Sequence, residues 1–313
     1  MIYVEILGRM GNQMFSYAFA RVLQQKIKKY SKDKIVFDYT NFEFGEEDRY
    51  CLKNYICEAN ISEGKRRCSL LQKALLHLYF KERNSSPIKN ETDIYRIETK
   101  WRDILNIFGI YLCSFNYYKF KFKPVTKNIL LLGYFESHLF FEEFDRILRE
   151  EFKPKLKKYN TEVSEIINMI CSTESVCIGV RRGDFESEDN KNFCSVCGPS
   201  FYERAVRYML KRVPAARFFI FTDDPVWAAD NLKVPPDTLI IGDNLIRFDD
   251  KLYIMSLCKN FIISNSTYVW WAQHLSDNQD KIVTAPDKWR NETPELHTGI
   301  YEKDWIIIEA DEI

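Results

Sequence analysis

The second half of the chain alternates short apolar runs with helix-compatible stretches, and this alternation constrains the fold most. Five runs rich in β-branched and aromatic residues are strand candidates: Val176–Val180, Phe218–Phe221, Leu239–Ile241, Phe261–Ile263 and Ile282–Thr284. Helical patterns lie between them, at Phe201–Arg212, Val226–Leu232, Asp249–Cys258 and Tyr268–Leu275. Strands that are apolar throughout and separated by helices belong to a parallel sheet covered on both faces. The second half is therefore predicted to be a doubly wound α/β domain.

The first half opens with a strand–helix–strand unit. The pattern predicts a strand at Ile2–Leu7, a loop at Gly8–Asn12, a helix at Gln13–Lys29 and a strand at Ile35–Asp38. Further helical patterns occur at Arg67–Lys81 and Leu139–Glu150. The basic-aromatic alternation Lys119–Lys123 indicates an edge strand, with contact to an anionic or lipid-linked molecule as the alternative. A second Rossmann-like domain is the expectation.

The chain has 313 residues, which is room for two domains of ordinary size. The charged segment Phe152–Lys158 contains Pro154 and follows a helical pattern, so it is the predicted crossing between domains. The predicted domains are residues 1–152 and 153–313, with a C-terminal tail able to pack back on the first domain.

Composition and the N-terminal residues exclude several classes of protein. Basic and acidic residues both number 45, so no global field draws the chain to nucleic acid. No apolar run approaches the roughly 18–20 residues that span a bilayer. Met1–Gly8 contains Glu5 and lacks a basic start, so it is expected to be a strand rather than a signal peptide. The expected location is the cytoplasm.

The nine cysteines predict reduced thiols rather than a disulfide framework, because their number is odd and they are scattered from Cys51 to Cys258. Cys194 and Cys197 have the spacing of half a zinc site or a redox pair. No second such pair or close histidine pair completes a ligand set. We interpret the two as structural thiols and predict no metal site.

Ligands of an open parallel sheet bind beyond the carboxyl ends of its strands, so residues directly after each apolar run are candidates. Arg181-Arg-Gly-Asp184 follows the first run of the second half. Two adjacent guanidinium groups, Arg181 and Arg182, can present planar sets of donors to a diphosphate. The alternative is a surface arginine pair held by Asp184.

Two further strand ends carry polar residues. Ser264, Asn265, Ser266 and Thr267 precede a helical pattern, so their hydroxyls and backbone N–H groups can hold a phosphate, with helix capping as the alternative. Asp223 and Asp224 can accept hydrogen bonds from a purine or ribose. Capping of the helix that begins at Pro225 is their alternative role.

The loop Gly8–Gln13 lacks the spacing of a dinucleotide-binding fingerprint. Asp38, at the end of the next strand, suits a ribose contact. An NAD-dependent oxidoreductase therefore stays open as an alternative.

Five segments together resemble glycosyltransferase family 11, the α-1,2-fucosyltransferases, and more distantly the α-1,6- and protein O-fucosyltransferases. They span nearly the whole chain, at residues 8–14, 133–137, 180–185, 221–224 and 258–271. The resemblance implies an α/β fold of GT-B type, with two Rossmann-like domains and a nucleotide-sugar cleft between them. The first domain would lie on the acceptor side, and the second would bind GDP-fucose.

By the same resemblance, Arg181 and Arg182 lie near the donor diphosphate, and Ser264–Thr267 line the phosphates. Asp223 or Asp224 faces the nucleoside, while Arg9 and Asn12, with Gln13 beside them, face the cleft and the acceptor. One position departs from the family: the histidine usually found two residues before the arginine pair is Gly179.

The resemblance implies an inverting transfer of L-fucose from GDP-β-L-fucose to the 2-hydroxyl of a terminal galactose, with no metal or other cofactor. Arg181 and Asp184 are the candidate catalytic residues. The candidate bases are Asp184, Glu186, Glu188 and Asp189. Another fucosyl linkage class and a catalytically silent glycan-binding protein are the alternatives. The expected partners are the donor GDP-fucose and a galactose-terminated glycan. If that glycan is linked to a lipid, the protein could reach it by a peripheral contact with the membrane.

Overall fold

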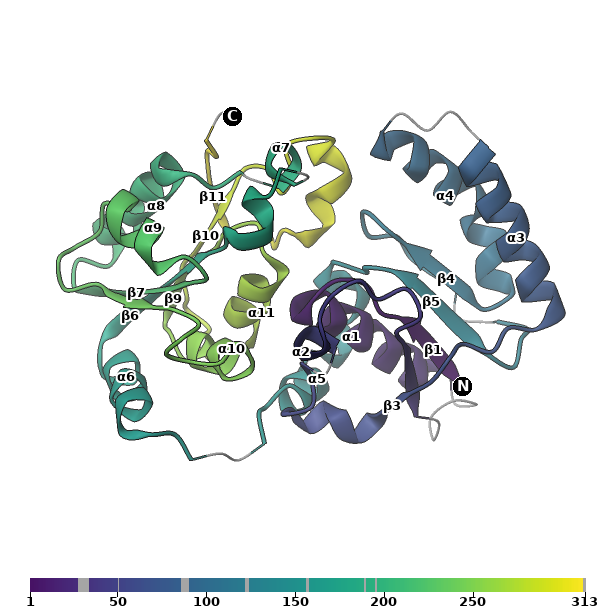
Figure 1. The fold of residues 1–313 in the computed structure, drawn as a ribbon, viewed down its shortest axis with the longest axis horizontal. Coiled ribbons are helices and arrows are strands. Elements are labelled where there is room, and N and C mark those ends of the chain that lie inside the picture. The colour runs from purple at the N-terminus through teal and green to yellow at the C-terminus, as the bar shows by residue number, and fades with distance from the viewer. Residues whose placement is uncertain are drawn as a thin grey trace. The chain divides into compact units, whose positions relative to one another are not determined.

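The structure is a computed structural model that describes residues 1–27, 34–49, 51–85, 90–121, 124–155, 158–188, 190–194 and 196–311. The chain forms two compact units (Figure 1). The first comprises Met1–Lys153 and Glu295–Ile300, and the second comprises Pro154–Pro294 and Tyr301–Ile313. The sequence prediction put the boundary between residues 152 and 153, whereas the contacts divide the chain between residues 153 and 154.

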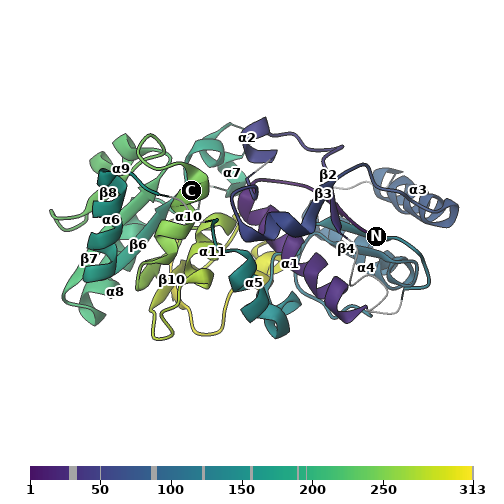
Figure 2. The same cartoon turned by 90° about the horizontal axis from the view of Figure 1, so that it is seen from below.

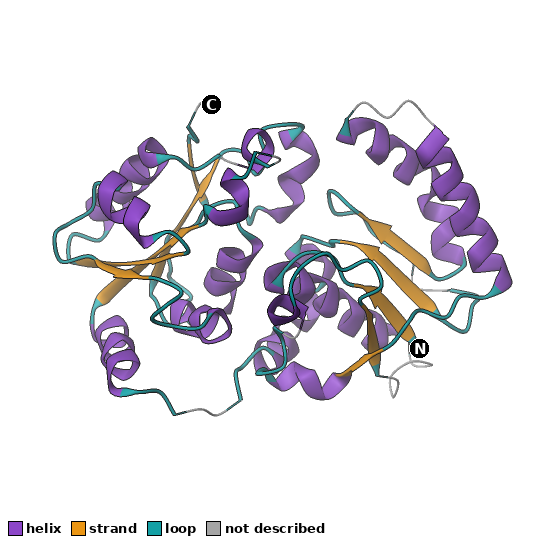
Figure 3. Cartoon of the chain, in the orientation of Figure 1, coloured by secondary structure: helices purple, strands orange, loops and turns teal. Residues whose placement is uncertain are grey.

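The first unit contains a five-stranded parallel sheet in the order β3-β2-β1-β5-β4. Its strands are β1 (Ile2–Glu5), β2 (Ile35–Asp38), β3 (Ile61–Glu63), β4 (Ile110–Cys113) and β5 (Ile129–Gly133). Its helices are α1 (Met10–Lys26), α2 (Glu46–Arg49), α3 (Leu70–Ser85), α4 (Glu91–Ile107) and α5 (Asp145–Glu151). Figure 3 shows the sheet as orange arrows among purple helices.

Alternate residues of these strands serve two separate cores, since successive side chains of a strand point to opposite faces. Tyr3, Leu112 and Leu130 pack with Leu75 of α3 and Ile97 of α4 in one core. The opposite face carries α1, whose Phe19 stacks on Phe135 at 4.7 Å between ring centroids and lies edge-on to Tyr111 of β4. Burial on both faces explains why β4 and β5 are apolar throughout.

The second unit contains a six-stranded parallel sheet in the order β11-β10-β9-β6-β7-β8. Its strands are β6 (Glu174–Val180), β7 (Ala216–Thr222), β8 (Leu239–Ile241), β9 (Asn260–Ile262), β10 (Val283–Pro286) and β11 (Ile306–Ile308). Its helices are α6 (Thr161–Ser172), α7 (Lys191–Cys194), α8 (Pro199–Arg212), α9 (Pro225–Asn231), α10 (Phe248–Ser256) and α11 (Thr267–Leu275).

Helices cover both faces of this sheet, as the turned view in Figure 2 also shows. Residues of α8 and α9 pack on Val176, Ile178 and Val180 of β6. On the opposite face, Val269 of α11 lies against Gly179 of the same strand. The predicted doubly wound sheet is therefore confirmed.

Strand order marks one point on each sheet where ligands are favoured. The chain runs from β6 outward through β7 and β8, then returns to the other side of β6 to form β9, β10 and β11. Such a reversal opens a crevice beyond the carboxyl ends of the two central strands, here β6 and β9. In the first unit the corresponding point lies between β1 and β5.

One prediction for the first half was wrong. Lys119, Phe120 and Lys121 form no strand; Phe120 is buried against Phe19, and the Lys121 N–H donates to the side chain of Asn106. The last two residues of that alternation, like the end of the helix predicted to reach Lys29, lie outside the described residues.

The predicted helix Leu139–Glu150 is confirmed only in its second half. Two 3-10 turns, His138–Phe140 and Glu142–Phe144, precede α5. The backbone leaves helical geometry at Phe141, where φ is −136°, and the side chains of Phe140 and Phe141 are buried there.

No described helix is both long enough and apolar enough to cross a membrane.

Candidate functional site

Three segments meet at the carboxyl edge of the second sheet because their strands are neighbours. Val180 of β6 pairs with Thr222 of β7, and Ile178 of β6 pairs with Ile262 of β9. The residues that follow these strands are Arg181–Asp184, Asp223–Asp224 and Ser264–Thr267. The three predicted segments therefore emerge at adjacent strand ends.

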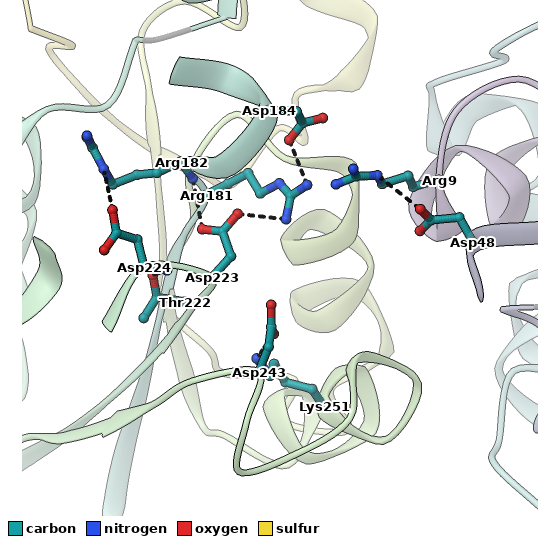
Figure 4. Close-up of polar contacts among 10 residues, drawn as sticks. All are labelled: Arg9, Asp48, Arg181, Arg182, Asp184, Thr222, Asp223, Asp224, Asp243 and Lys251. Carbon is teal, nitrogen blue, oxygen red and sulfur yellow. Dashed lines mark hydrogen bonds and ion pairs between the residues drawn. The ribbon is translucent and has the colours of Figure 1, made fainter. Parts of the chain in front are cut away.

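Two carboxylates hold the guanidinium group of Arg181 (Figure 4). Its Nη2 lies 2.6 Å from Asp184 Oδ1, and its Nη1 lies 2.8 Å from Asp223 Oδ2. The side chain is 25% exposed. The ion pair with Asp184, which the sequence analysis gave as the alternative to an anion site, is thus present. Asp223, in the loop after β7, forms a second ion pair with Arg181.

Arg182 is held by the same loop. Its backbone N–H donates to Asp223 Oδ1 at 3.0 Å, and its Nε lies 3.4 Å from Asp224 Oδ2. The guanidinium carbon lies 4.0 Å from the ring centroid of Trp227, a cation–π distance. Asp223 therefore contacts both arginines and fixes them relative to each other.

Asp224 also caps a helix, which was the alternative weighed for it. Its Oδ1 accepts from the Trp227 N–H at 3.0 Å at the start of α9, and its own N–H donates to Thr222 Oγ1. Both oxygens of Asp223 and both oxygens of Asp224 therefore contact protein groups, and one or both arginines are among the partners of each residue.

Ser264–Thr267 lead directly into α11. Ser266 is the N-cap residue, but its hydroxyl makes no capping hydrogen bond to the helix. Ser264 and Ser266 are buried, and Thr267 is half-buried. The N-terminal backbone N–H groups of α11 thus lie beside the crevice between β6 and β9, in the geometry that favours an anion.

Asn265, predicted to contact phosphate, uses its side chain inside the protein. Its Nδ2 donates to the carbonyl oxygens of Cys194 at 2.8 Å and of Trp289 at 2.9 Å. The thiol of Cys197 donates to its Oδ1 at 3.8 Å. Asn265 therefore joins the loops that follow β6, β9 and β10.

Gly179 makes room for helix α11. A Cβ atom at this position would lie 2.5 Å from Cγ2 of Val269 and 3.0 Å from its Cβ, closer than real Cβ atoms approach. Val269 therefore fills the space that a side chain at position 179 would occupy.

At the carboxyl edge of the first sheet, Gly8 has a φ of +69° and precedes α1. Nε of Arg9 lies 3.3 Å from Asp48 Oδ2, and its guanidinium carbon lies 5.3 Å from the Phe44 ring. A Cβ on Gly8 would lie 3.0 Å from Cγ of Asn12, so the Asn12 side chain packs against this turn.

Gln13, predicted to face the acceptor, is buried. Its Nε2 donates to the carbonyl oxygen of Asp48 at 2.8 Å, and its Oε1 accepts from the Cys51 thiol. Its side chain holds α1 to the segment around α2.

Asp38 has no carboxylate oxygen available for a ribose. It is 2% exposed; Oδ1 accepts from Thr40, and Oδ2 accepts from the Arg66 N–H at 3.1 Å. The ribose interpretation was therefore wrong, because both carboxylate oxygens already accept hydrogen bonds from Thr40 and Arg66 within the first unit.

The strand-end rule also applies to Asp243, which the sequence analysis overlooked. It follows β8 and is 57% exposed at its side chain, where it pairs with the buried Lys251 of α10. Burial, followed by the charges of Asp243 and Asp249, raises the pKa of the nearby Tyr268. Lys251, whose side chain is 4% exposed, therefore holds a carboxylate that is itself more than half exposed.

The candidate bases differ in their surroundings. Asp184 is paired with Arg181, and Glu186 lies 3.7 Å from Arg182 Nη1. Glu188 is exposed, whereas Asp189 lies outside the described residues.

Cys194 and Cys197 are free thiols, and burial raises the pKa of Cys197. Within the described part of the chain, no group of three His, Cys, Asp or Glu side chains could hold a metal ion.

Comparison with known proteins gives the same family along the whole chain. The model of Glycosyl transferase family 11 matches residues 1–309. The O-antigen biosynthesis glycosyltransferase WbnK of Escherichia coli is 28% identical over 310 residues, or 92% of this chain and 94% of that protein. The alpha-1,2-colitosyltransferase of Escherichia coli is 29% identical over 167 residues, or 52% of this chain and 56% of that protein.

Solved structures were also compared. Fucosyltransferase NodZ from Bradyrhizobium covers 87% of this chain and 92% of its own, with 11% identity and a TM-score of 0.46. The ADP-heptose lps heptosyltransferase II of E. coli covers 98% of this chain and 89% of its own, with 14% identity and a TM-score of 0.47. The family match and the two Rossmann-like sheets agree with a fold of GT-B type.

Proposed function

The chain belongs to glycosyl transferase family 11, and on this premise we propose that it is an inverting fucosyltransferase. The proposed reaction moves L-fucose from GDP-β-L-fucose to the 2-hydroxyl of a terminal galactose in a glycan. That the chain is a glycosyltransferase follows from the family; the donor, the acceptor and the linkage are the proposal. The observation that carries it is the arginine pair fixed by Asp223 at the reversal point of the second sheet.

We assign the donor diphosphate to the crevice between β6 and β9. Arg181 and Arg182 lie on one side, and the N-terminus of α11 lies on the other. A guanidinium group has more N–H donors than its contacts with Asp184 and Asp223 use, so phosphate oxygens can still be bound. The carboxylates pre-orient the donors, which lowers the cost of ordering them in the reaction.

We assign the guanine base to Asp243. Asp223 and Asp224 are engaged with arginines and a helix end, whereas Asp243 is more than half exposed, one strand further out on β8. A carboxylate accepts hydrogen bonds only, and guanine offers two adjacent N–H groups that adenine lacks. Lys251 holds one oxygen of Asp243 and so sets the direction of the carboxylate.

The arginines stabilise the reacting groups most as the glycosidic bond breaks. Negative charge then grows on the β-phosphate while the sugar becomes oxocarbenium-like, so fixed cations stabilise the transition state more than the bound donor. Paired arginines can perform the charge neutralisation that a divalent ion provides in other enzymes. We propose on this ground that transfer needs no metal.

The acceptor hydroxyl must lose a proton during the attack. Asp184 is the proposed base because it lies 2.6 Å from Arg181, closer than Glu186 lies to Arg182. Its ion pair keeps it in place, and release of one oxygen to the incoming hydroxyl would leave the other on the arginine.

We place the acceptor sugar at the carboxyl edge of the first sheet. Tyr39, Phe42 and Phe44 form a run of edge-to-face and tilted rings, with centroids 5.4 and 5.6 Å apart, that ends at the exposed Phe44. An aromatic ring offers an apolar face to a sugar, and Arg9 beside it offers polar contacts to hydroxyls. Asn12 stays a candidate contact, whereas Gln13 acts through the loop that it holds.

The name of the alpha-1,2-colitosyltransferase relative supports colitose as a second candidate for the transferred sugar, so its GDP derivative is tested as well. The discriminating experiment incubates the protein with GDP-fucose, GDP-colitose, GDP-mannose or UDP-galactose, using lactose as acceptor, with and without EDTA. The proposal expects transfer from GDP-fucose, resistance to EDTA, and product NMR that shows an α-fucoside on the 2-hydroxyl of galactose. Preferred transfer from UDP-galactose, or hydrolysis and binding without transfer to any galactoside, would refute it.

A further inference from the structure

Helix α3 exposes a stripe of leucines. Leu70 is 86% exposed, Leu71 is 49% exposed and Leu78 is 51% exposed. With Ala74, these residues fall within one face of the helix, because residues three, four and seven apart lie on the same side. The stripe is therefore continuous rather than a set of scattered side chains.

The exposed stripe is separate from the face that anchors α3. Gln72, Leu75 and Tyr79 are the buried residues of the helix, and Leu75 and Tyr79 pack in the core below the sheet. Gln72 also donates to the carbonyl oxygens of Phe108 and Asn128, both at 3.0 Å. The helix packs on its own unit through the face of Gln72, Leu75 and Tyr79, so the leucines of the stripe remain exposed to solvent.

Positive charge lies next to the leucines. Lys73 and Lys81 are exposed; Lys73 lies beside Leu70 on the edge of the stripe, and Lys81 lies one turn beyond Leu78. Lys65 and Arg67 are exposed just before the helix. The sequence from Lys65 to Lys81 contains no acidic residue, although the whole chain has equal numbers of acids and bases.

We propose that this surface, Leu70, Leu71, Ala74 and Leu78 with Lys73 and Lys81, docks the protein on an anionic lipid bilayer. Apolar side chains flanked by lysines on one helical face suit the boundary between acyl chains and charged headgroups. Each lysine near such a surface adds electrostatic attraction, while each leucine adds apolar burial.

The charge pattern favours a bilayer over a second copy of the chain. A symmetric dimer through this face would bring two sets of lysines together with no acidic residue of the stripe to pair them, and like charges oppose such a contact. An anionic surface meets the lysines with opposite charge and gives the leucines an apolar layer to enter.

The test is cosedimentation of the full chain with vesicles of phosphatidylcholine alone or mixed with phosphatidylglycerol. Binding to the mixed vesicles, weaker in high salt, is expected. Leu71→Gln with Leu78→Gln should lower the partition coefficient by about tenfold per leucine, and Lys73→Gln with Lys81→Gln by about fivefold per lysine. Glutamine is a good helix former, so α3 should stay folded.

The matched control is Val226→Gln on α9 of the second unit, because Val226 is 71% exposed and is not on the stripe. It should bind vesicles like the unchanged protein, and circular dichroism should be the same for all variants. The proposal is overturned if the unchanged chain does not sediment with anionic vesicles, or if the leucine variants bind as well as the control. A dimer in solution that the leucine variants dissociate would also overturn it, in favour of self-association.

Discussion

Gly179→Ala tests why α11 can approach β6 so closely. The new methyl group would lie 2.5 Å from Cγ2 of Val269, in a region where Val269 is 4% exposed and cannot move into solvent. Overpacking of this kind costs about 1–3 kcal/mol of unfolding free energy. We expect a loss in the upper part of that range, because both methyl groups of Val269 face the added carbon.

A second substitution distinguishes crowding against Val269 from a loss of stability that does not depend on Val269. Val269→Ala alone removes two buried methyl groups and should cost about 2 kcal/mol. In the double variant the methyl group added at position 179 can occupy the space that Val269 leaves. The double variant should therefore be more stable than the sum of the two losses predicts, by about 1–3 kcal/mol.

Urea unfolding followed by tryptophan fluorescence is a suitable assay, because Trp270 and Trp271 are fully buried beside Val269. The midpoints should shift with unchanged slopes, so that the shifts report stability. Additive losses in the double variant, or a Gly179→Ala protein as stable as the unchanged one, would refute the crowding argument. The result bears on function too, since the same contact positions the N-terminus of α11.

Four further outcomes are expected. Arg181→Ala should lower kcat about 10²–10³-fold in a folded protein, and Arg181→Lys should recover little of it, because an ammonium group cannot bridge Asp184 and Asp223 in the same geometry; near-normal kcat for Arg181→Lys would contradict this. Asp243→Asn should weaken GDP binding about 10–100-fold in calorimetry while binding of IDP, which lacks the 2-amino group, changes less; equal losses would remove Asp243 from base recognition. Asn265→Ala should cost roughly 2–4 kcal/mol of stability, measured by denaturation, because the carbonyl oxygens of Cys194 and Trp289 lose their donor. Burial raises the pKa of Glu98, so the folded state binds the proton of this carboxyl more tightly than the unfolded chain does. The free energy of unfolding should therefore fall as pH rises through the raised pKa. Glu98→Gln should lack this loss, and denaturation curves of both proteins at several pH values would show it.

The central strands of the second sheet could be predicted because helices cover both faces of the sheet, so each of these strands contains a run that is apolar throughout. Val176–Val180 and Phe218–Phe221 are buried on both faces, and such runs are recognisable without knowledge of the partner strand. Edge strands carry less of this signal: β3 (Ile61–Glu63) and β11 (Ile306–Ile308) have three residues each and no fully buried one. Both were missed. The fully buried β4 and β5 were missed too, whereas the short edge strand β8 was predicted, so burial alone does not decide which strands the sequence reveals.

The site shows a different limit of sequence reasoning. The strand-end rule selected the segments that meet at one edge, but it could not show which side chains turn outward. Asn265 turns inward to Cys194 and Trp289, and Gln13 turns inward to Asp48, contacts that join residues 24 to 71 positions apart. Asp243 was overlooked although the same rule covers it, because the lysine that orients it belongs to the next helix.

The short segment Glu295–Ile300 has a consequence for how this protein can be divided or recombined. It belongs to the first unit although it follows nearly all of the second, and Asn116 binds Glu295 and Gly299 while Glu91 lies 2.9 Å from His297. A fragment ending at Lys153 would lack these partners. A chimaera made with one breakpoint near that residue would import a foreign segment against Asn116 and Glu91. Exchange of the second unit between relatives therefore requires two additional junctions, one on either side of Glu295–Ile300, so that this segment stays with the first unit.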